Sequence, residues 1–231
     1  MAGVDTLAVV SSTGEGHATE VPRLRGWIHL VAFVISLVAG AALVGVAAAV
    51  GELTAILVTA LYAVGLSALF GVSALYHRRR WRSTRSRAWM GRLDHATIFV
   101  FIACSYTVFA VLAMPADLAR ALLALVWLGA AAGVALELAR PAGRRWLRVP
   151  LYLALGWAVV PVIGQIGSHL EPGTIALLAA GGVAYSIGAV LYAARWPNPW
   201  PRTFGHHEVF HAATVVGATF HAAAVWMLLI G

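Results

Sequence analysis

Seven long apolar stretches dominate this sequence, and they restrict what the chain can fold into more than any other feature. Each is about 20 residues long, the length that an α-helix needs to cross the roughly 30 Å hydrocarbon core of a bilayer. Because backbone polar groups must be paired in hydrocarbon, spans of this kind form helices. The stretches cover residues 26–50, 53–76, 94–114, 118–138, 149–168, 174–194 and 206–230. We therefore predict an all-α integral membrane protein, a bundle of seven transmembrane helices.

The composition agrees with a membrane protein. Of the 231 residues, 61% are hydrophobic and only 11% are charged, whereas a soluble domain carries about 25% charged residues. We assign residues 1–22 to a short disordered tail and residues 23–231 to the transmembrane domain. The single cysteine, Cys104, excludes an intramolecular disulfide. It lies in an apolar run, and we interpret it as a small buried hydrophobic side chain.

Arginines mark one side of the predicted bundle. The net charge is +7, and all the basic residues are arginines. All but Arg120 lie just before the first stretch or in loops that face the same side. They are Arg23, Arg25, Arg78, Arg79, Arg80, Arg82, Arg85, Arg87, Arg92, Arg140, Arg144, Arg145, Arg148, Arg195 and Arg202. The positive-inside rule then predicts a cytoplasmic N-terminus, a C-terminus outside the cell and a multi-pass protein of the plasma membrane. It also explains the basic charge better than a nucleic-acid partner does.

Metal-binding side chains gather at the cytoplasmic helix ends of this topology. His77 ends the second stretch, Asp94 begins the third, and His207 and His211 lie in the first turns of the seventh. Ionisable groups at such depths are costly and are functional by default. Residues four apart lie about 6 Å apart along a helix, so His207 and His211 can reach one ion. Imidazole nitrogens are preferred zinc ligands, and the pattern favours zinc held by His77, His207 and His211.

Two further residues complete the predicted site. Asp94 is expected to orient or deprotonate a water molecule, and Ser73 lies one helical turn before His77 and can hydrogen-bond the water or the carboxylate. Each residue has a simpler explanation when taken alone. His77 can be interfacial, Asp94 can be a helix N-cap, and Ser73 can bond to its own helix. Their agreement in depth favours the metal site.

The sequence His207-Glu-Val-Phe-His211 also matches the zinc-protease pattern in which the glutamate is the general base. The extended pattern requires a glycine at position 214 and a histidine at 217, and this chain has Thr214 and Gly217. We hold this hypothesis as the weaker one and expect Glu208 to face a loop or the cytoplasmic interface. Of the other histidines, His95 and His206 are expected to point away from the site, and His29 and His221 are expected to make interior hydrogen bonds.

Small residues and proline predict local details of the bundle. Gly129-Ala-Ala-Ala-Gly133 is a small-residue motif typical of close helix packing in membranes. Pro161 is expected to kink the fifth helix.

Four sequence motifs together resemble the hemolysin III family, the bacterial branch of the progestin and adiponectin receptor superfamily. They begin at Pro22 (Pro-Arg-Leu-Arg-Gly-Trp-Ile-His), Ser73 (Ser-Ala-Leu-Tyr-His), Leu93 (Leu-Asp-His) and Phe204 (Phe-Gly-His-His-Glu-Val-Phe-His). The resemblance implies a seven-helix bundle with a cytoplasmic N-terminus. It also implies zinc held by residues matching His77, His207 and His211, with Ser73 and Asp94 acting through a bridging water.

Three functional hypotheses follow. The leading one is a membrane-embedded zinc hydrolase acting on a lipid amide or ester, with ceramidase-like chemistry suggested by the superfamily. The second, suggested by the family name, is a pore-forming or cytolytic membrane protein. The third is a membrane-homeostasis regulator or receptor in which zinc is structural. In each the partner is a membrane lipid, as substrate or ligand, and no pattern in the sequence specifies an oligomeric state.

Overall fold

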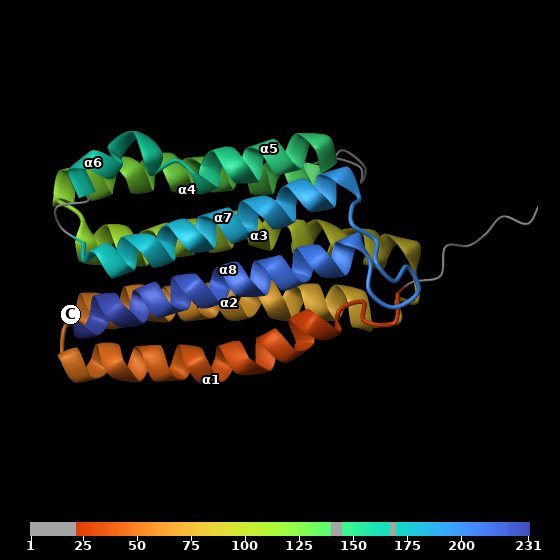
Figure 1. Ribbon diagram of the computed structural model, residues 1–231, viewed down its shortest axis with the longest axis horizontal. Coiled ribbons are helices and arrows are strands. Elements are labelled where there is room, and N and C mark those ends of the chain that lie inside the picture. Colours follow the sequence, from red (N-terminus) through yellow and green to blue (C-terminus); the bar gives the residue numbers. More distant parts are fainter. Residues whose placement is uncertain (1–21, 140–144, 167–169) are drawn as a thin grey trace, which may run out of the picture.

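The chain folds into antiparallel helices packed side by side (Figure 1). The computed structural model describes residues 22–139, 145–166 and 170–231. Within these ranges, seven segments are long and apolar enough to cross a membrane, which confirms the predicted all-α bundle. The predicted disordered tail, apart from Pro22, lies outside the described residues.

The helices agree closely with the seven predicted stretches, with two exceptions discussed below. Their bounds are α1 (Trp27–Val50), α2 (Leu53–Arg78), α3 (Thr84–Ala113), α4 (Ala116–Ala139), α5 (Arg145–Gly156), the 3-10 turn η1 (Val160–Val162), α6 (Ile163–Ile166), α7 (Pro172–Ala194) and α8 (His206–Ile230). The short elements α5, η1 and α6 together make one span.

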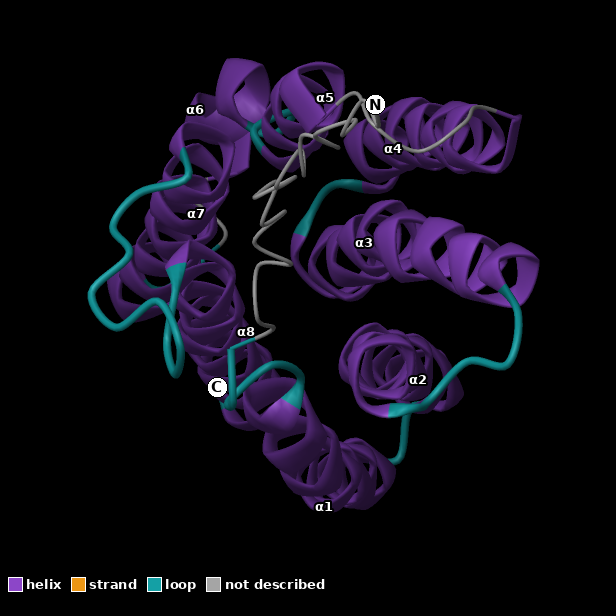
Figure 2. Ribbon diagram, turned by 90° about the vertical axis from the view of Figure 1, so that its right-hand side faces the viewer, coloured by secondary structure: helices purple, strands orange, loops and turns teal. Residues whose placement is uncertain are grey.

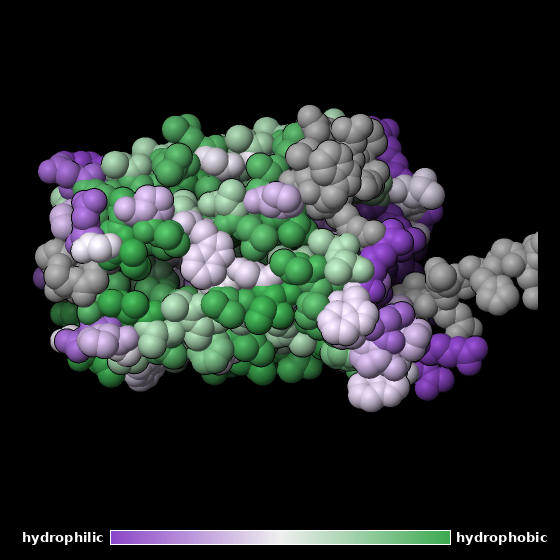
Figure 3. Space-filling model, turned by 45° about the horizontal axis from the view of Figure 1, so that its top comes forward, coloured by the Kyte–Doolittle hydropathy of each residue, from purple (hydrophilic) through white to green (hydrophobic). Residues whose placement is uncertain are grey.

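Consecutive helices are neighbours around the bundle, and α8 packs against both α7 and α1 (Figure 2). A core of buried side chains, among them Tyr62, Phe101 and Val225, lies between α1, α2, α3 and α8. The outer surface is apolar as well: Val38 is 70% exposed and Leu128 is 72% exposed. The strongly hydrophilic side chains gather at the two ends of the molecule (Figure 3). An apolar belt between polar ends is the surface that a bilayer requires.

The small-residue motif in α4 has the predicted packing role. A Cβ at Gly133 would lie 2.5 Å from the Phe99 ring of α3, and one at Gly129 would lie 2.8 Å from Leu155 of α5. Without a hydrophobic driving force between helices in lipid, close packing of this kind is a main source of association. The motif therefore sets how closely α3 and α5 approach α4.

The start of α3 differs from the prediction. The helix begins at Thr84 and not at Asp94, because Ser83 accepts a hydrogen bond from the backbone N–H of Ser86 and caps it there. Its 30 residues extend over about 45 Å, longer than the hydrocarbon layer. Asp94 is therefore an interior helix residue, and its interpretation as an N-cap is wrong.

The fifth span is interrupted, as Pro161 predicted. Helix α5 ends at Gly156, and η1, which contains Pro161, precedes the single turn of α6. The hydroxyl of Tyr106, in α3, donates to the carbonyl of Gly156 at 2.8 Å and accepts from the N–H of Val159 at 3.1 Å. This side chain thus satisfies two backbone groups that the break removes from helical bonding.

Candidate metal centre

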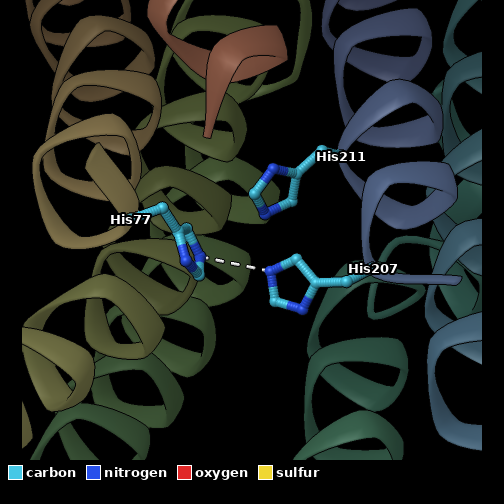
Figure 4. A group of neighbouring side chains, drawn as sticks. All are labelled: His77, His207 and His211. Carbon is cyan, nitrogen blue, oxygen red and sulfur yellow. Dashed lines mark hydrogen bonds between the residues drawn. The ribbon is translucent and has the colours of Figure 1, made fainter. Parts of the chain in front are cut away.

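Three histidine side chains converge at one end of the bundle (Figure 4). His77 comes from the last turn of α2, and His207 and His211 come from the first two turns of α8. One ring nitrogen from each lies within 4.8 Å of those of the other two. The Nε2 atoms of His77 and His207 are 3.1 Å apart. Nitrogens bound to one tetrahedral zinc ion are about 3.3 Å apart, close to the separation of these two atoms.

The chemistry of these donors suits a metal ion. Each imidazole can offer a lone pair, and His211 is 2% exposed with its Nδ1 buried and lacking a hydrogen-bond partner within the described residues. Buried polar atoms are normally paired, so a cluster of ring nitrogens with such an orphan fits a site for a cation. The three histidines can supply three ligands and leave a fourth position open, the arrangement of catalytic zinc sites.

Asp94 and Ser73 lie beside the histidines. An Asp94 carboxylate oxygen is 3.7 Å from His77 Nε2, and the Ser73 side chain hydrogen-bonds to Asp94. Both side chains are buried. Although Asp94 is ten residues inside α3, the length of that helix beyond the hydrocarbon layer places it level with the end of α2. The structure therefore brings together all five residues that the sequence predicts to form the site.

Glu208 faces the turn before α1 and the connection that leads into α8, as the sequence predicts for a residue directed at a loop. It is fully buried there. One of its oxygens contacts Arg25 Nε at 2.5 Å, and the other accepts from the backbone N–H of Gly205 at 2.9 Å. Both carboxylate oxygens are therefore engaged away from the three histidines, which argues against a role as the general base. Glutamate three residues after an N-cap was the sequence signal for this bond.

Two further histidines, His221 and His29, lie inside membrane spans. His221 Nε2 lies 3.3 Å from the Leu178 carbonyl, the interior hydrogen bond we expected. His29, for which we also expected an interior hydrogen bond, is buried in the bundle. Its ring stacks on His211 at a centroid distance of 3.7 Å.

His95 also differs from expectation, because it borders the cavity beside the metal centre. Its Nδ1 is 3.9 Å from Glu137 Oε2 and 3.4 Å from Arg148. Arg148 and Glu137 form an ion pair at 2.6 Å, in which Glu137 is buried. This network links α3, α4 and α5 near the site. Nothing in helical periodicity pairs these residues, which lie far apart in the sequence.

One cavity borders the metal centre, and a second cavity adjoins the first. The smaller, of about 40 Å³, is lined by residues that include Asp94, His207 and His211. The larger, of about 130 Å³, is lined mainly by apolar side chains such as Phe101, Ile102 and Trp157. Both are lined by a shared set of six residues: Leu69, Ile98, Tyr152, Ala189, Phe210 and Thr214. An apolar space therefore continues from the histidines toward the middle of the bundle.

Comparisons with known proteins identify similar chains. The family model described as Haemolysin-III related matches residues 18–222. Hemolysin-3 homolog of Bacillus subtilis is 26% identical over 190 residues, which cover 82% of this chain and 85% of that protein. Hemolysin-3 of Bacillus cereus is 26% identical over 73% of each chain. Heptahelical transmembrane protein ADIPOR2 of Oryza sativa is 34% identical over 73% of this chain and 80% of that protein.

Proposed function

Because this chain belongs to the haemolysin-III-related family, we propose that it is a membrane-embedded zinc hydrolase acting on an amide or ester bond of a lipid, with ceramidase-like chemistry. One observation carries the proposal. Three imidazoles converge on a common point, with Asp94 beside them and an apolar cavity adjoining. Metal ligands, a carboxylate and a space for an acyl chain are the parts that such a reaction needs.

His77, His207 and His211 hold the ion in this proposal. Zinc bound in an open three-histidine site supplies a Lewis acid that polarises a carbonyl oxygen and acidifies water. The two histidines of α8 are four residues apart and share one helix face, and His77 completes the set from α2. Two helices thus define the position of the ion.

Asp94 handles the proton. It accepts a proton from the attacking water and returns it to the leaving amine or alcohol, the usual work of a buried general base and acid. Ser73 holds the Asp94 carboxylate by its hydrogen bond and so fixes which oxygen faces the substrate. The substrate acyl chain occupies the larger cavity, which brings the scissile carbonyl to the smaller cavity beside the histidines.

The test compares fatty-acid release by zinc-loaded wild type and by Asp94→Asn, using ceramides and phospholipids in detergent micelles. We expect Asp94→Asn to keep its zinc and to lose about 10²- to 10⁴-fold in rate, the usual contribution of a general base. The double variant His207→Ala, His211→Ala is the matched control and should lose both zinc and activity. Equal rates for wild type and Asp94→Asn, or no release from any lipid by zinc-loaded wild type, would sink the hydrolase proposal.

Two other functions are alternatives to lipid hydrolysis. A regulator with structural zinc uses the same ligands, but removal of zinc then lowers thermal stability without abolishing a turnover. Cytolysis is raised by the name of the Bacillus cereus relative, Hemolysin-3. Leakage from sealed vesicles at low protein content, unchanged in the double histidine variant, would favour cytolysis over hydrolysis.

We also propose that the metal centre lies on the cytoplasmic side of the plasma membrane, with the N-terminus inside and the C-terminus outside. The arginines of the α2–α3 connection and of the first turns of α3 lie at the same end as the three histidines. Short arginine-rich segments stay in the cytoplasm during insertion.

A further inference from the structure

The residues that lead into α1 contact the metal centre at several points, although none of them is a candidate ligand. Residues 23–29, which we call the N-terminal clamp, precede α1 and form its first turn. The contacts involve both helices that carry the three histidines. Figure 4 shows the ribbon of the first described residues passing beside the rings.

The first contact is an ion pair between Arg25 and Glu208. Glu208 lies between His207 and His211 in α8, is fully buried and meets Arg25 Nε at 2.5 Å. Removing one partner of such a pair leaves an uncompensated buried charge. The first turn of α8, which carries His207, is therefore tied to the clamp.

Backbone hydrogen bonds reinforce this attachment. The N–H of Arg23 donates to the carbonyl of Arg202 at 3.0 Å, and that of Leu24 donates to the carbonyl of Thr203 at 3.1 Å. Arg202 and Thr203 belong to the connection that leads into α8. The clamp thus holds both the entry to α8 and its first turn.

The second contact is with α2. A Cβ at Gly26 would lie 2.7 Å from the Cβ of His77, so the backbone of the clamp packs directly against this histidine. The next residue, Trp27, lies beneath the Arg78 guanidinium at 4.0 Å from the ring centroid, a cation–π contact. The clamp therefore limits movement of His77 on the side that faces Gly26.

The third contact is the stack of His29 on His211. The rings are 3.7 Å apart with 9° between their planes. His29 is 3% exposed, so its ring is enclosed within the bundle. Because the stack restricts rotation of the His211 ring, it favours the orientation in which one nitrogen faces the other two histidines.

We propose that the N-terminal clamp positions His77, His207 and His211 for one divalent metal ion, with Arg25, Glu208 and His29 as the positioning residues. This rests on the metal site of the proposed function. Partners that orient metal ligands from outside are worth about 10- to 100-fold in metal affinity, and the clamp provides such partners for ligands on two different helices.

The test follows zinc release from the full-length, zinc-loaded protein in detergent into excess chelator, beside thermal unfolding of the metal-free protein. The variants are Arg25→Met, Glu208→Gln and the two combined. Arg23→Met is the matched control, because Arg23 belongs to the same segment and is exposed. We expect each single variant to release zinc about 10- to 100-fold faster than wild type, and the control to match wild type.

The combined variant separates positioning from simple stabilisation. It removes both charges, so the metal-free protein should regain much of the melting temperature lost in the single variants. Its zinc release should stay fast, because the Arg25–Glu208 ion pair no longer holds the first turn of α8 to the clamp. His29→Ala should also release zinc faster, and His29→Phe, which keeps a planar ring, should restore retention.

Other results overturn the proposal. Zinc release equal to that of Arg23→Met in the single variants would show that the clamp does not position the ligands. Zinc retention that returns with the melting temperature in the combined variant would show a structural role only. If the wild type keeps zinc but cleaves no lipid, only the hydrolase proposal is contradicted. The rates of zinc release then still test whether the clamp positions the ligands. Wild type that binds no zinc overturns both.

Discussion

Single residues decide whether the three imidazoles share one centre. Two of them follow from helical spacing in α8, but His77 depends on what packs against α2. Gly26 has φ of +79° and allows no room for a Cβ on the side of His77. Glycine is required at this position for two reasons: the backbone is left-handed, and the Cβ of His77 lies too close for another Cβ. These two requirements can be separated by experiment.

Gly51 provides the comparison, because it has φ of +87° with open space around its Cβ position. Gly26→Ala and Gly51→Ala should each cost about 1–2 kcal/mol in stability, because a side chain disfavours the left-handed conformation. Only Gly26→Ala should also displace His77 and speed zinc release, by about tenfold or more. Thermal unfolding and chelator competition measure the two effects. Equal zinc release by the two variants would contradict the steric argument.

At the scale of residues, the sequence predicts which side chains lie at the same membrane depth better than it predicts which side chains contact each other. His77, Asp94 and His207 were placed together because ionisable groups at one membrane depth are rarely there by chance. The pairing of Arg25 with Glu208 spans 183 residues of chain, and the stack of His29 on His211 joins the first and last helices. Neither contact joins residues of the same helix, so helical spacing in the sequence cannot predict it and only the folded bundle shows it.

At the scale of elements, hydropathy located the spans but not all their limits. A change to apolar residues marks where a helix enters hydrocarbon, whereas a cap marks where it begins. In α3 these points differ, because Ser83 starts the helix in a polar, arginine-rich segment. In the fifth span Pro161 predicted the interruption, but the side chain that compensates for it comes from α3.

Tyr106 should be important for the stability of this interruption. Tyr106→Phe removes the partner of the Gly156 carbonyl and of the Val159 N–H. Both groups lie in a membrane span, where an unpaired backbone group costs about 1–3 kcal/mol, so the melting temperature in detergent should fall. Tyr62→Phe is the matched control, since Tyr62 is fully buried and its hydroxyl has no partner among the described residues. It should be neutral or slightly stabilising. A similar loss in both variants would contradict a specific role for the Tyr106 hydroxyl.

For the whole molecule, an apolar belt with hydrophilic ends defines how the bundle lies in a membrane, but not which end faces the cytoplasm (Figure 3). That choice comes from the arginines, which concentrate just before α1 and in the loops at the end that carries the metal centre. The natural cysteine, Cys104, is 2% exposed and should react little with maleimides. Single cysteines introduced at the two ends can therefore report orientation against a low background.

Thr84→Cys and Ala116→Cys place an exposed thiol at the arginine-rich end and at the opposite end. In intact cells, a membrane-impermeant maleimide should label Ala116→Cys and leave Thr84→Cys unlabelled until the cells are permeabilised. Wild type, with Cys104 alone, gives the background. The positive-inside rule requires this result, because moving the arginine-rich α2–α3 connection across the membrane is strongly disfavoured. Labelling of Thr84→Cys in intact cells would instead place the metal centre outside, where a lipid substrate would come from the outer leaflet.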